Sequence, residues 1–190
     1  MQTNIIAKFT GDEAEAHRLH AYEGVRSLYG IVRTLTLAGH FVATGDVRQR
    51  YPFTTELEIF YEPPRRGSWE AVFAILSDPA TLAFGGAIAA GITANLFTDT
   101  VKTIFSRVMG SDEQPETAEL RAYEERQPGH LDALVDAIEP SATEAHTVIG
   151  HGARNIVIIR GHNNIVNMNE RTKEYLKTSI KNEDVFYTGR

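Results

Sequence analysis

The sequence predicts an α+β protein in which two long helices pack on a small antiparallel sheet, with a further hairpin near the C-terminal end. The helices are indicated by two long stretches, residues 19–42 and 79–109, in which apolar residues recur at helical spacing. The strands are indicated by short β-branched and aromatic runs bounded by Pro, Gly or Asn. A chain of 190 residues is long enough to bury a substantial core.

Charge divides the chain into three segments. Residues 111–144 carry two Lys or Arg against ten Asp or Glu, although the whole chain has a formal net charge of only −6. We therefore expect an α+β core domain at 1–110, an acidic helical segment at 111–144, and a β-hairpin with a short helix at 145–190. An acidic segment in the middle of the chain argues against a continuous basic surface, so we expect no generic nucleic-acid partner.

Composition also excludes several kinds of chemistry. The chain has no cysteine, which rules out thiol catalysis, disulfides and cysteine-ligated metal centres. The N-terminal residues lack the basic and apolar regions of a secretory signal, so we expect a cytoplasmic protein. No catalytic signature is found, and the sequence predicts no cofactor and favours a protein that is not an enzyme.

The first two elements are a short strand and a long helix. Residues 4–9 read as a short strand that ends at Thr10-Gly11, and Asp12 with Glu15 three residues later resembles a helix N-terminus. We expect one helix from Asp12 to about Val42. From Leu19 to Val42 its polar residues thin to a narrow stripe, which predicts burial on several sides; that stripe consists of Arg26, Arg33 and His40, flanked by Ser27 and Thr34.

A hairpin and a second long helix follow. Residues 57–61 and 68–75 read as strands around a turn at Pro63–Gly67, because proline cannot donate a ladder hydrogen bond and glycine permits a turn. Asp78-Pro79 then predicts the start of a helix that extends to Met109.

Small residues line the start of the second long helix in two adjacent rows. They recur every four positions, at Ala83, Ala87 and Gly91 and at Gly86, Ala90 and Ala94. Such a face admits another backbone at unusually short distance. Three partners are possible: the first long helix, the same helix in a second copy, or a membrane into which residues 82–97 insert. Sixteen residues that include Thr93 and Asn95 fall short of a membrane span.

The last third contains two short helices and a hairpin. We expect acidic surface helices at 116–126 and 130–138, the second of them stopped by Pro140. A hairpin at 155–168 turns through Gly and Asn, and residues 170–179 read as a short helix.

The hairpin at 155–168 also bears on assembly. Its first arm, residues 156–159, is apolar at four successive positions and requires cover on both faces. With few candidates in the chain to supply that cover, we expect a homo-oligomer that self-associates through Ile156 and Ile158 or through the small-residue rows.

Two clusters of polar residues are candidate binding sites. Four arginines on two loops match the geometry of phosphate or lipid headgroups, although pairing with carboxylates of the same protein is the alternative; they are Arg48, Arg50, Arg65 and Arg66. Four residues on one side of the expected first helix are weak metal-ligand candidates, with a solvated helix face as the alternative; they are Glu13, His17, His20 and Glu23.

Three segments resemble an uncharacterised bacterial protein family: GDVRQRYPF at 45–53, PPRRGS at 63–68 and GGAIAAG at 85–91. The resemblance implies no activity and no catalytic residue. It also implies that related chains continue beyond the hairpin into a second β-rich region, so the present chain is either a short member or an N-terminal part, and we expect the latter.

Three functional hypotheses are compatible with these observations. The first is a non-enzymatic bacterial assembly module that self-associates. The second is an effector that perturbs membranes through residues 82–97, in phage defence or a mobile element. The third is a phosphate- or nucleotide-binding protein that uses the arginine loops.

Overall fold

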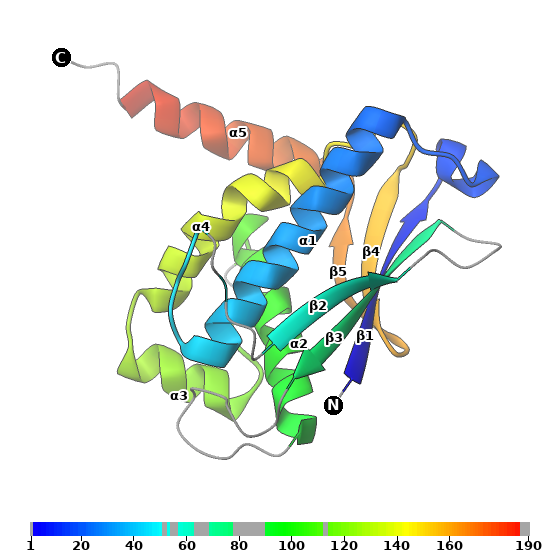
Figure 1. Ribbon diagram of the computed structural model, residues 1–190. Coiled ribbons are helices and arrows are strands. Elements are labelled where there is room, and N and C mark those ends of the chain that lie inside the picture. Colours follow the sequence, from blue (N-terminus) through cyan, green and yellow to red (C-terminus); the bar gives the residue numbers. More distant parts are fainter. Residues whose placement is uncertain are drawn as a thin grey trace.

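A computed structural model describes residues 2–50, 53, 57–62, 69–77, 90–111 and 114–186 of the chain (Figure 1). It confirms the predicted α+β class. In chain order the elements are β1 (Gln2–Thr10), a 3₁₀ helix η1 (Asp12–Ala16), α1 (Ala21–Thr44), β2 (Leu57–Glu62), β3 (Glu70–Ser77), α2 (Ala90–Val108), α3 (Ala118–Arg126), α4 (His130–Ala145), β4 (Asn155–Arg160), β5 (Asn163–Met168) and α5 (Glu170–Phe186).

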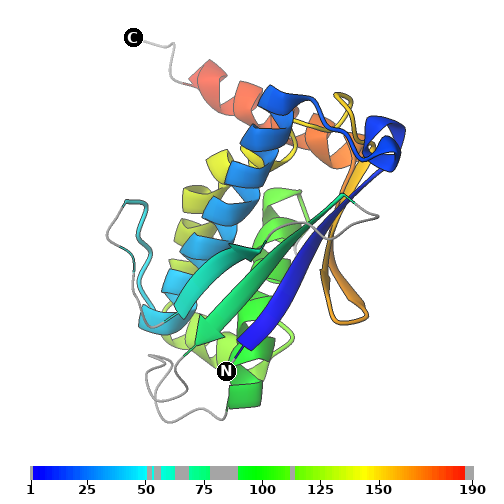
Figure 2. The same cartoon turned by 45° about the vertical axis from the view of Figure 1, so that its right-hand side comes forward.

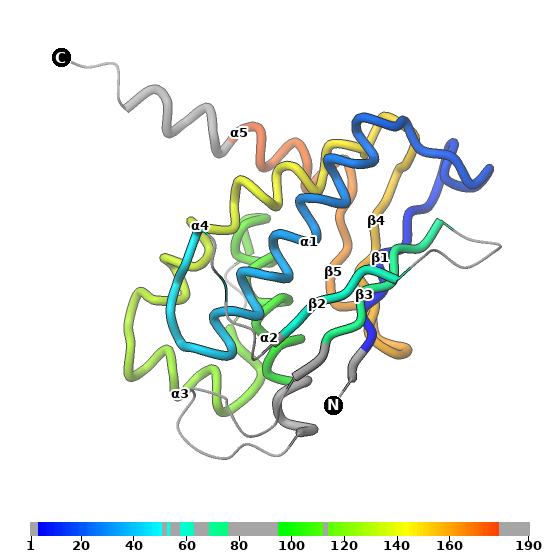
Figure 3. The backbone as a smooth tube through the Cα atoms, in the orientation of Figure 1, coloured from blue at the N-terminus to red at the C-terminus, as the bar shows by residue number. Residues whose placement is uncertain are grey.

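The strands, labelled on the backbone trace of Figure 3, form one antiparallel sheet in the order β2-β3-β1-β4-β5. The N-terminal strand lies at its centre, with Ala7 opposite Ala71 of β3 on one side and Ile158 of β4 on the other. The predicted C-terminal hairpin therefore exists, and it extends the sheet that the N-terminal residues begin.

This pairing corrects one step of the sequence argument. Cover for the hairpin at 155–168 was expected from a second subunit, but β1 and the helices of the same chain provide it. Ile156 and Ile158 are completely buried within the single chain, so their side chains are not available for self-association. The sequence could not reveal this because the paired strands lie about 150 residues apart.

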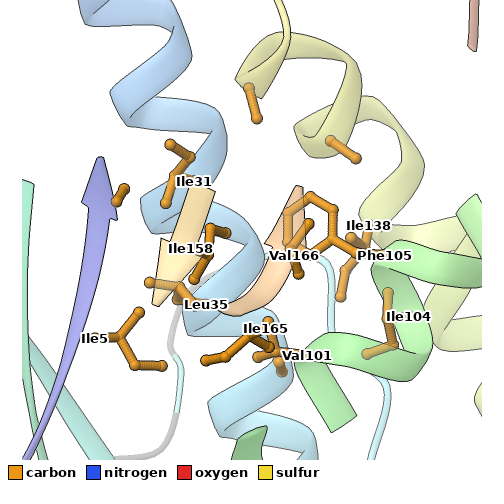
Figure 4. Packing of buried hydrophobic residues seen from close by; sticks show 14 of the residues in the cluster. Ile5, Ile31, Leu35, Val101, Ile104, Phe105, Ile138, Ile158, Ile165 and Val166 are labelled. Carbon is orange, nitrogen blue, oxygen red and sulfur yellow. The ribbon is translucent and has the colours of Figure 1, made fainter. Parts of the chain in front are cut away.

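The helices pack on one side of the sheet, and α1 crosses it with α2 and α4 behind (Figures 1 and 2). The core lies between these layers. Figure 4 shows Ile31 and Leu35 of α1 meeting Ile158 of β4, while Phe105 of α2 and Ile138 of α4 close the same cluster. The buried cluster includes residues from all three segments that charge distinguishes.

The first helix begins later than predicted. Residues Asp12–Ala16 form a 3₁₀ turn, His17 adopts a left-handed conformation, and α1 starts at Ala21. The prediction of one helix from Asp12 is wrong because backbone groups here bond to a distant loop. The N–H of Ala14 donates to the Gly152 carbonyl at 2.8 Å, and the N–H of Arg154 donates to the Thr10 carbonyl at 2.8 Å.

The acidic segment is also less superficial than its composition suggests. Helix α4 continues through Pro140 to Ala145, so the predicted stop at this proline is wrong. Proline costs the helix one backbone hydrogen bond, but burial of an apolar face offsets that loss. The buried residues of α4 include Leu131, Leu134, Ile138 and Ala142.

Carboxylates anchor the acidic segment to α2. Asp99 is buried and accepts the backbone N–H groups of Glu116 and Thr117, at 3.0 and 2.8 Å, just before α3 begins. Arg107 donates to Glu124 at 2.7 Å and to Asp132 at 3.2 Å. Part of the negative charge at 111–144 is thus balanced within the chain.

The predicted small-residue rows fall mainly outside the described residues, which resume at Ala90; the side chains of residues 90–94 are outside them as well. The proposed self-association through Ala83, Gly86, Ala87, Ala90, Gly91 and Ala94 therefore stays a prediction. The same holds for membrane insertion of residues 82–97. Among the described helices, none combines the length and apolar character needed to cross a membrane.

Candidate functional site

Helices α1 and α4 run antiparallel and approach each other very closely at one end. A Cβ atom placed on Gly30 of α1 would overlap the backbone nitrogen of Ala145 and the carbonyl oxygen of Ser141. The Ser27 hydroxyl donates to the Ala145 carbonyl at 2.6 Å within the same contact. Only glycine at position 30 permits this approach, because backbone atoms cannot move aside as a flexible side chain can.

Ionic and polar contacts line the outer edge of this closed end. The guanidinium of Arg26 binds the Glu144 carboxylate with two hydrogen bonds of 2.6 Å each. This fork lowers the pKa of Glu144. The Thr147 hydroxyl reaches the Glu23 carbonyl at 3.1 Å, so the contact extends along α1 from Glu23 to Gly30.

At the other end, the same two helices leave space between them. A cavity of about 710 Å³ lies where α1 ends and α4 begins. Helix α1 contributes His40 and Thr44, α4 contributes His130 and Ala133, and the segment after α1 contributes the rest of the described lining, which is Asp46, Val47, Arg48 and Phe53.

His40 is held in this cavity as a neutral imidazole. Its side chain is only 6% exposed, and its ring meets that of Phe53 edge to face at 5.9 Å. Burial lowers the pKa of His40, the positive charge of Arg48 lowers it further, and Asp46 opposes this with a smaller effect. At neutral pH the ring is therefore uncharged, with one nitrogen that donates and one that accepts.

The hydrogen bonds around His130 define which of its nitrogens carries the proton. The Tyr123 hydroxyl lies 2.7 Å from the Gly45 carbonyl and 2.9 Å from Nδ1 of His130. Burial raises the pKa of Tyr123, so the phenol keeps its single proton, which the Gly45 carbonyl must receive. Nδ1 of His130 is then the donor to Tyr123. In neutral His130 the basic nitrogen is consequently Nε2.

The described lining of the cavity thus combines one guanidinium, two imidazoles and one carboxylate. Arg48 supplies a positive charge suited to phosphate or carboxylate oxygens. His130 offers Nε2 as a hydrogen-bond acceptor, or as a donor when protonated. Asp46 disfavours a ligand that is only anionic and favours one that also carries a hydrogen-bond donor.

Only part of the predicted arginine cluster appears at this cavity. Arg48 lines it, while Arg50 is exposed and is not among the lining residues that the structure describes. Arg65 and Arg66 lie outside the described residues. Sequence reasoning missed His130 and Asp46; the only local signal was the Pro128-Gly129 turn that places His130 at the start of a helix.

The four metal-ligand candidates do not share a helix face. The left-handed conformation of His17 separates Glu13 from α1, and His20 precedes the first residue of that helix. Glu13 instead pairs with Arg18 at 2.7 Å, and His20 lies 4.0 Å from Glu23. Within the described part of the chain, no three His, Asp or Glu side chains are grouped so that they could hold a metal ion.

Comparison with models of known protein families identifies the family of the chain. Residues 5–177 match the model of a domain of unknown function, DUF7946. The chain belongs to this family. The match confirms the expected kinship with an uncharacterised family, and it includes every residue described as lining the cavity. No curated protein and no solved structure matches the chain significantly.

Proposed function

We propose that this protein binds a small phosphate-bearing molecule in the cavity between the end of α1 and the start of α4. The observation that carries the proposal is the placement of Arg48 with His40 and His130 around a space of about 710 Å³. This proposal follows the third of the functional hypotheses, with Arg48 and two histidines as the described groups that carry it.

The lining favours a phosphate attached to a hydroxylated group, such as a nucleotide or a sugar phosphate. Arg48 would bind the phosphate. Nε2 of His130 would accept a hydrogen bond from the phosphate or, when protonated, donate a hydrogen bond to it. A ligand hydroxyl would satisfy Asp46. The ring of Phe53 provides an apolar surface beside these polar groups.

Ligand-dependent thermal stability tests the proposal. We would titrate the protein with inorganic phosphate, ribose 5-phosphate and adenosine monophosphate, and with ribose as the uncharged control. A ligand at 100 times its Kd stabilises the folded state by about 2.7 kcal/mol, which is readily seen as a shift in Tm. Stabilisation by the phosphate compounds but not by ribose is expected.

A pair of neighbouring variants identifies the site. Arg48→Gln removes the charge at the cavity and should abolish the stabilisation. Arg50→Gln removes an exposed arginine two residues later and should leave it unchanged. No response to any phosphate compound, or equal responses in the two variants, would refute the proposal.

Self-association is a second candidate function, and one observation favours it. Tyr22, Val25 and Tyr29 lie on one side of α1 and are 69%, 67% and 56% exposed. Arg26 lies over the ring of Tyr22 at 5.4 Å, and aromatic and arginine side chains are typical of interface centres. Two antiparallel copies of α1 centred on Val25 would place Tyr22 of each opposite Tyr29 of the other.

Light scattering tests this second candidate. The wild type should have at least twice the 21.1 kDa chain mass, and Val25→Glu should return it to the monomer mass. A wild type that is monomeric at micromolar concentration would contradict self-association. A bacterial origin and a cytoplasmic location stay predictions, supported by the resemblance and by the absence of cysteine.

A further inference from the structure

We propose that the free edge of β2 binds an extended, basic segment of another protein, which would add a strand to the sheet. Strand β2 stands at the end of the strand order, so β3 pairs with only one of its two edges (Figure 1). Within the parts of the chain that the structure describes, no backbone group bonds to the other edge. Such an edge offers N–H and C=O groups to an incoming strand. None of the described residues that line the cavity between α1 and α4 belongs to β2.

Two neighbouring aromatic side chains of β2 are exposed to solvent. Phe60 and Tyr61 are each 50% exposed, and they point to opposite faces of the sheet because they are successive residues of a strand. Tyr61 contacts the ring of Phe73, a core residue, at 5.8 Å, whereas Phe60 stands opposite Ala74 on the other face. A strand added along this edge would cover part of both rings, so apolar burial would accompany the new backbone hydrogen bonds.

Carboxylates flank Phe60 on its own face of the sheet. Glu58 and Glu62 lie two residues before and after it, so the three side chains share that face. Neither carboxylate forms an ion pair with a residue that the structure describes. The same face already holds one cross-strand ion pair, between Lys8 of β1 and Glu70 of β3 at 3.5 Å. Basic side chains on an added strand could bind Glu58 and Glu62 in the same way.

This charge pattern favours a basic strand over a second copy of β2. Two copies paired antiparallel about Phe60 would place Glu58 of each opposite Glu62 of the other. Like charges that stand directly opposite each other destabilise a sheet. A strand with Lys or Arg at two positions four residues apart, and an apolar residue midway between them, would place a positive charge opposite each carboxylate. The apolar residue would then lie against Phe60.

Peptide titration of the whole chain tests this surface. We would record two-dimensional amide NMR spectra with the peptide Gly-Lys-Thr-Val-Thr-Lys-Gly, which has the required pattern, and we expect saturable shifts at residues 57–62. The peptide Gly-Glu-Thr-Val-Thr-Glu-Gly reverses the two charges. The peptide Gly-Lys-Pro-Pro-Pro-Lys-Gly keeps the charges but removes the three central N–H donors. Neither control peptide should produce these shifts, because binding requires both the charges and the backbone hydrogen bonds.

A pair of double variants tests the carboxylates. Glu58→Gln/Glu62→Gln should weaken binding of the basic peptide about fivefold or more, because it removes both charge pairs. Glu15→Gln/Glu125→Gln makes the same change in net charge at two exposed carboxylates on η1 and α3, and it should leave binding unchanged.

A pair of single variants tests the aromatic contact. Phe60→Ala should also weaken binding, whereas Tyr22→Ala, which removes an exposed ring of α1, should not. Absence of saturable shifts at β2, equal binding of the proline peptide, or binding that loss of both β2 carboxylates leaves intact would overturn the proposal. Shifts at β2 that depend on protein concentration without peptide would assign the edge to a second copy of the chain, which would also overturn it.

Discussion

The two ends of the α1–α4 pair show how one helix contact can be closed at one end and open at the other. At the closed end, Gly30 and Ser27 of α1 bring the helix against the backbone of α4 near Ala145. At the open end, the helices carry the imidazole rings of His40 and His130, and a cavity remains. These rings are much larger than the side chains of Gly30 and Ser27 at the closed end. Side-chain size decides which end can admit a ligand.

The comparison also separates structural from functional polar groups. At the closed end, Arg26 and Glu144 bind each other, and the Ser27 hydroxyl donates to a backbone carbonyl. At the open end, His130 is oriented by Tyr123 through one nitrogen, and its other nitrogen has the chemistry to meet a ligand. We therefore expect substitutions at the closed end to change stability and those at the open end to change binding.

The largest expected effect is at Gly30. Gly30→Ala introduces a Cβ into the backbone of α4, which must shift, and should lower the free energy of unfolding by about 3 kcal/mol or more. Gly24→Ala is the matched control on the same helix, because its Cβ would meet side-chain atoms of Leu19 at 3.1 Å or more and no backbone atom. Urea unfolding that gives similar stabilities for the two variants would show that the closed end is not tightly packed.

A smaller effect is expected from pH. Burial lowers the pKa of both His40 and His146, whose Nδ1 donates to the Ala142 carbonyl at 2.7 Å. The unfolded chain then takes up protons more readily than the folded one, so stability is full above about pH 6.5 and decreases as the pH falls below it. Urea unfolding between pH 7.5 and pH 5.5 measures this decrease. His146→Gln should reduce the slope, and a wild type equally stable throughout would contradict the assignment.

A smaller effect is expected from the Ser27 hydroxyl on α1, which belongs to the same contact as Gly30. Ser27 is buried and hydrogen-bonded to Ala145, so Ser27→Ala should cost about 1 kcal/mol of unfolding free energy. Thermal and urea unfolding of the two single variants and the Ser27→Ala/Gly30→Ala double variant would show whether the two residues act together. Strict additivity would contradict a shared contact.

The smallest effect has the opposite sign. The Thr34 hydroxyl is buried and has no hydrogen-bond partner among the residues that the structure describes, as is also true of Ser141 on α4. Thr34→Val replaces this hydroxyl by a methyl group of similar size and should stabilise the protein by about 1 kcal/mol or less. A loss of stability in urea unfolding would show that the hydroxyl is satisfied, for example by a buried water molecule.

These comparisons show which features the sequence could predict. Strands near residues 4–9, 57–75 and 155–168 were predictable from local composition, as was the α+β class. The pairing of β1 with β4 was not, because it joins residues from opposite ends of the chain. Pro140 pointed to a helix end that tertiary packing overrides.

The candidate site was predictable only in part. Arg48 stood out because arginines cluster nearby, and His40 stood out as a polar residue on an apolar helix. Nothing in the local sequence connects either residue with His130, which reaches the cavity through the antiparallel course of α4. Close helix contact was predicted at Gly86 and Gly91, but among the described residues it occurs at Gly30, a glycine that the small-residue pattern did not single out.

The most direct test of the central claim, that the open end binds a phosphate-bearing ligand, is nitrogen NMR of the imidazole side chains. Without ligand, the single ring proton of neutral His130 should lie on Nδ1, and His40 should be uncharged at neutral pH. Adding adenosine monophosphate or ribose 5-phosphate should shift the Nε2 resonance of His130 in the wild type and in Arg50→Gln, but not in Arg48→Gln. Imidazole resonances that saturating phosphate compounds leave unmoved would contradict the account.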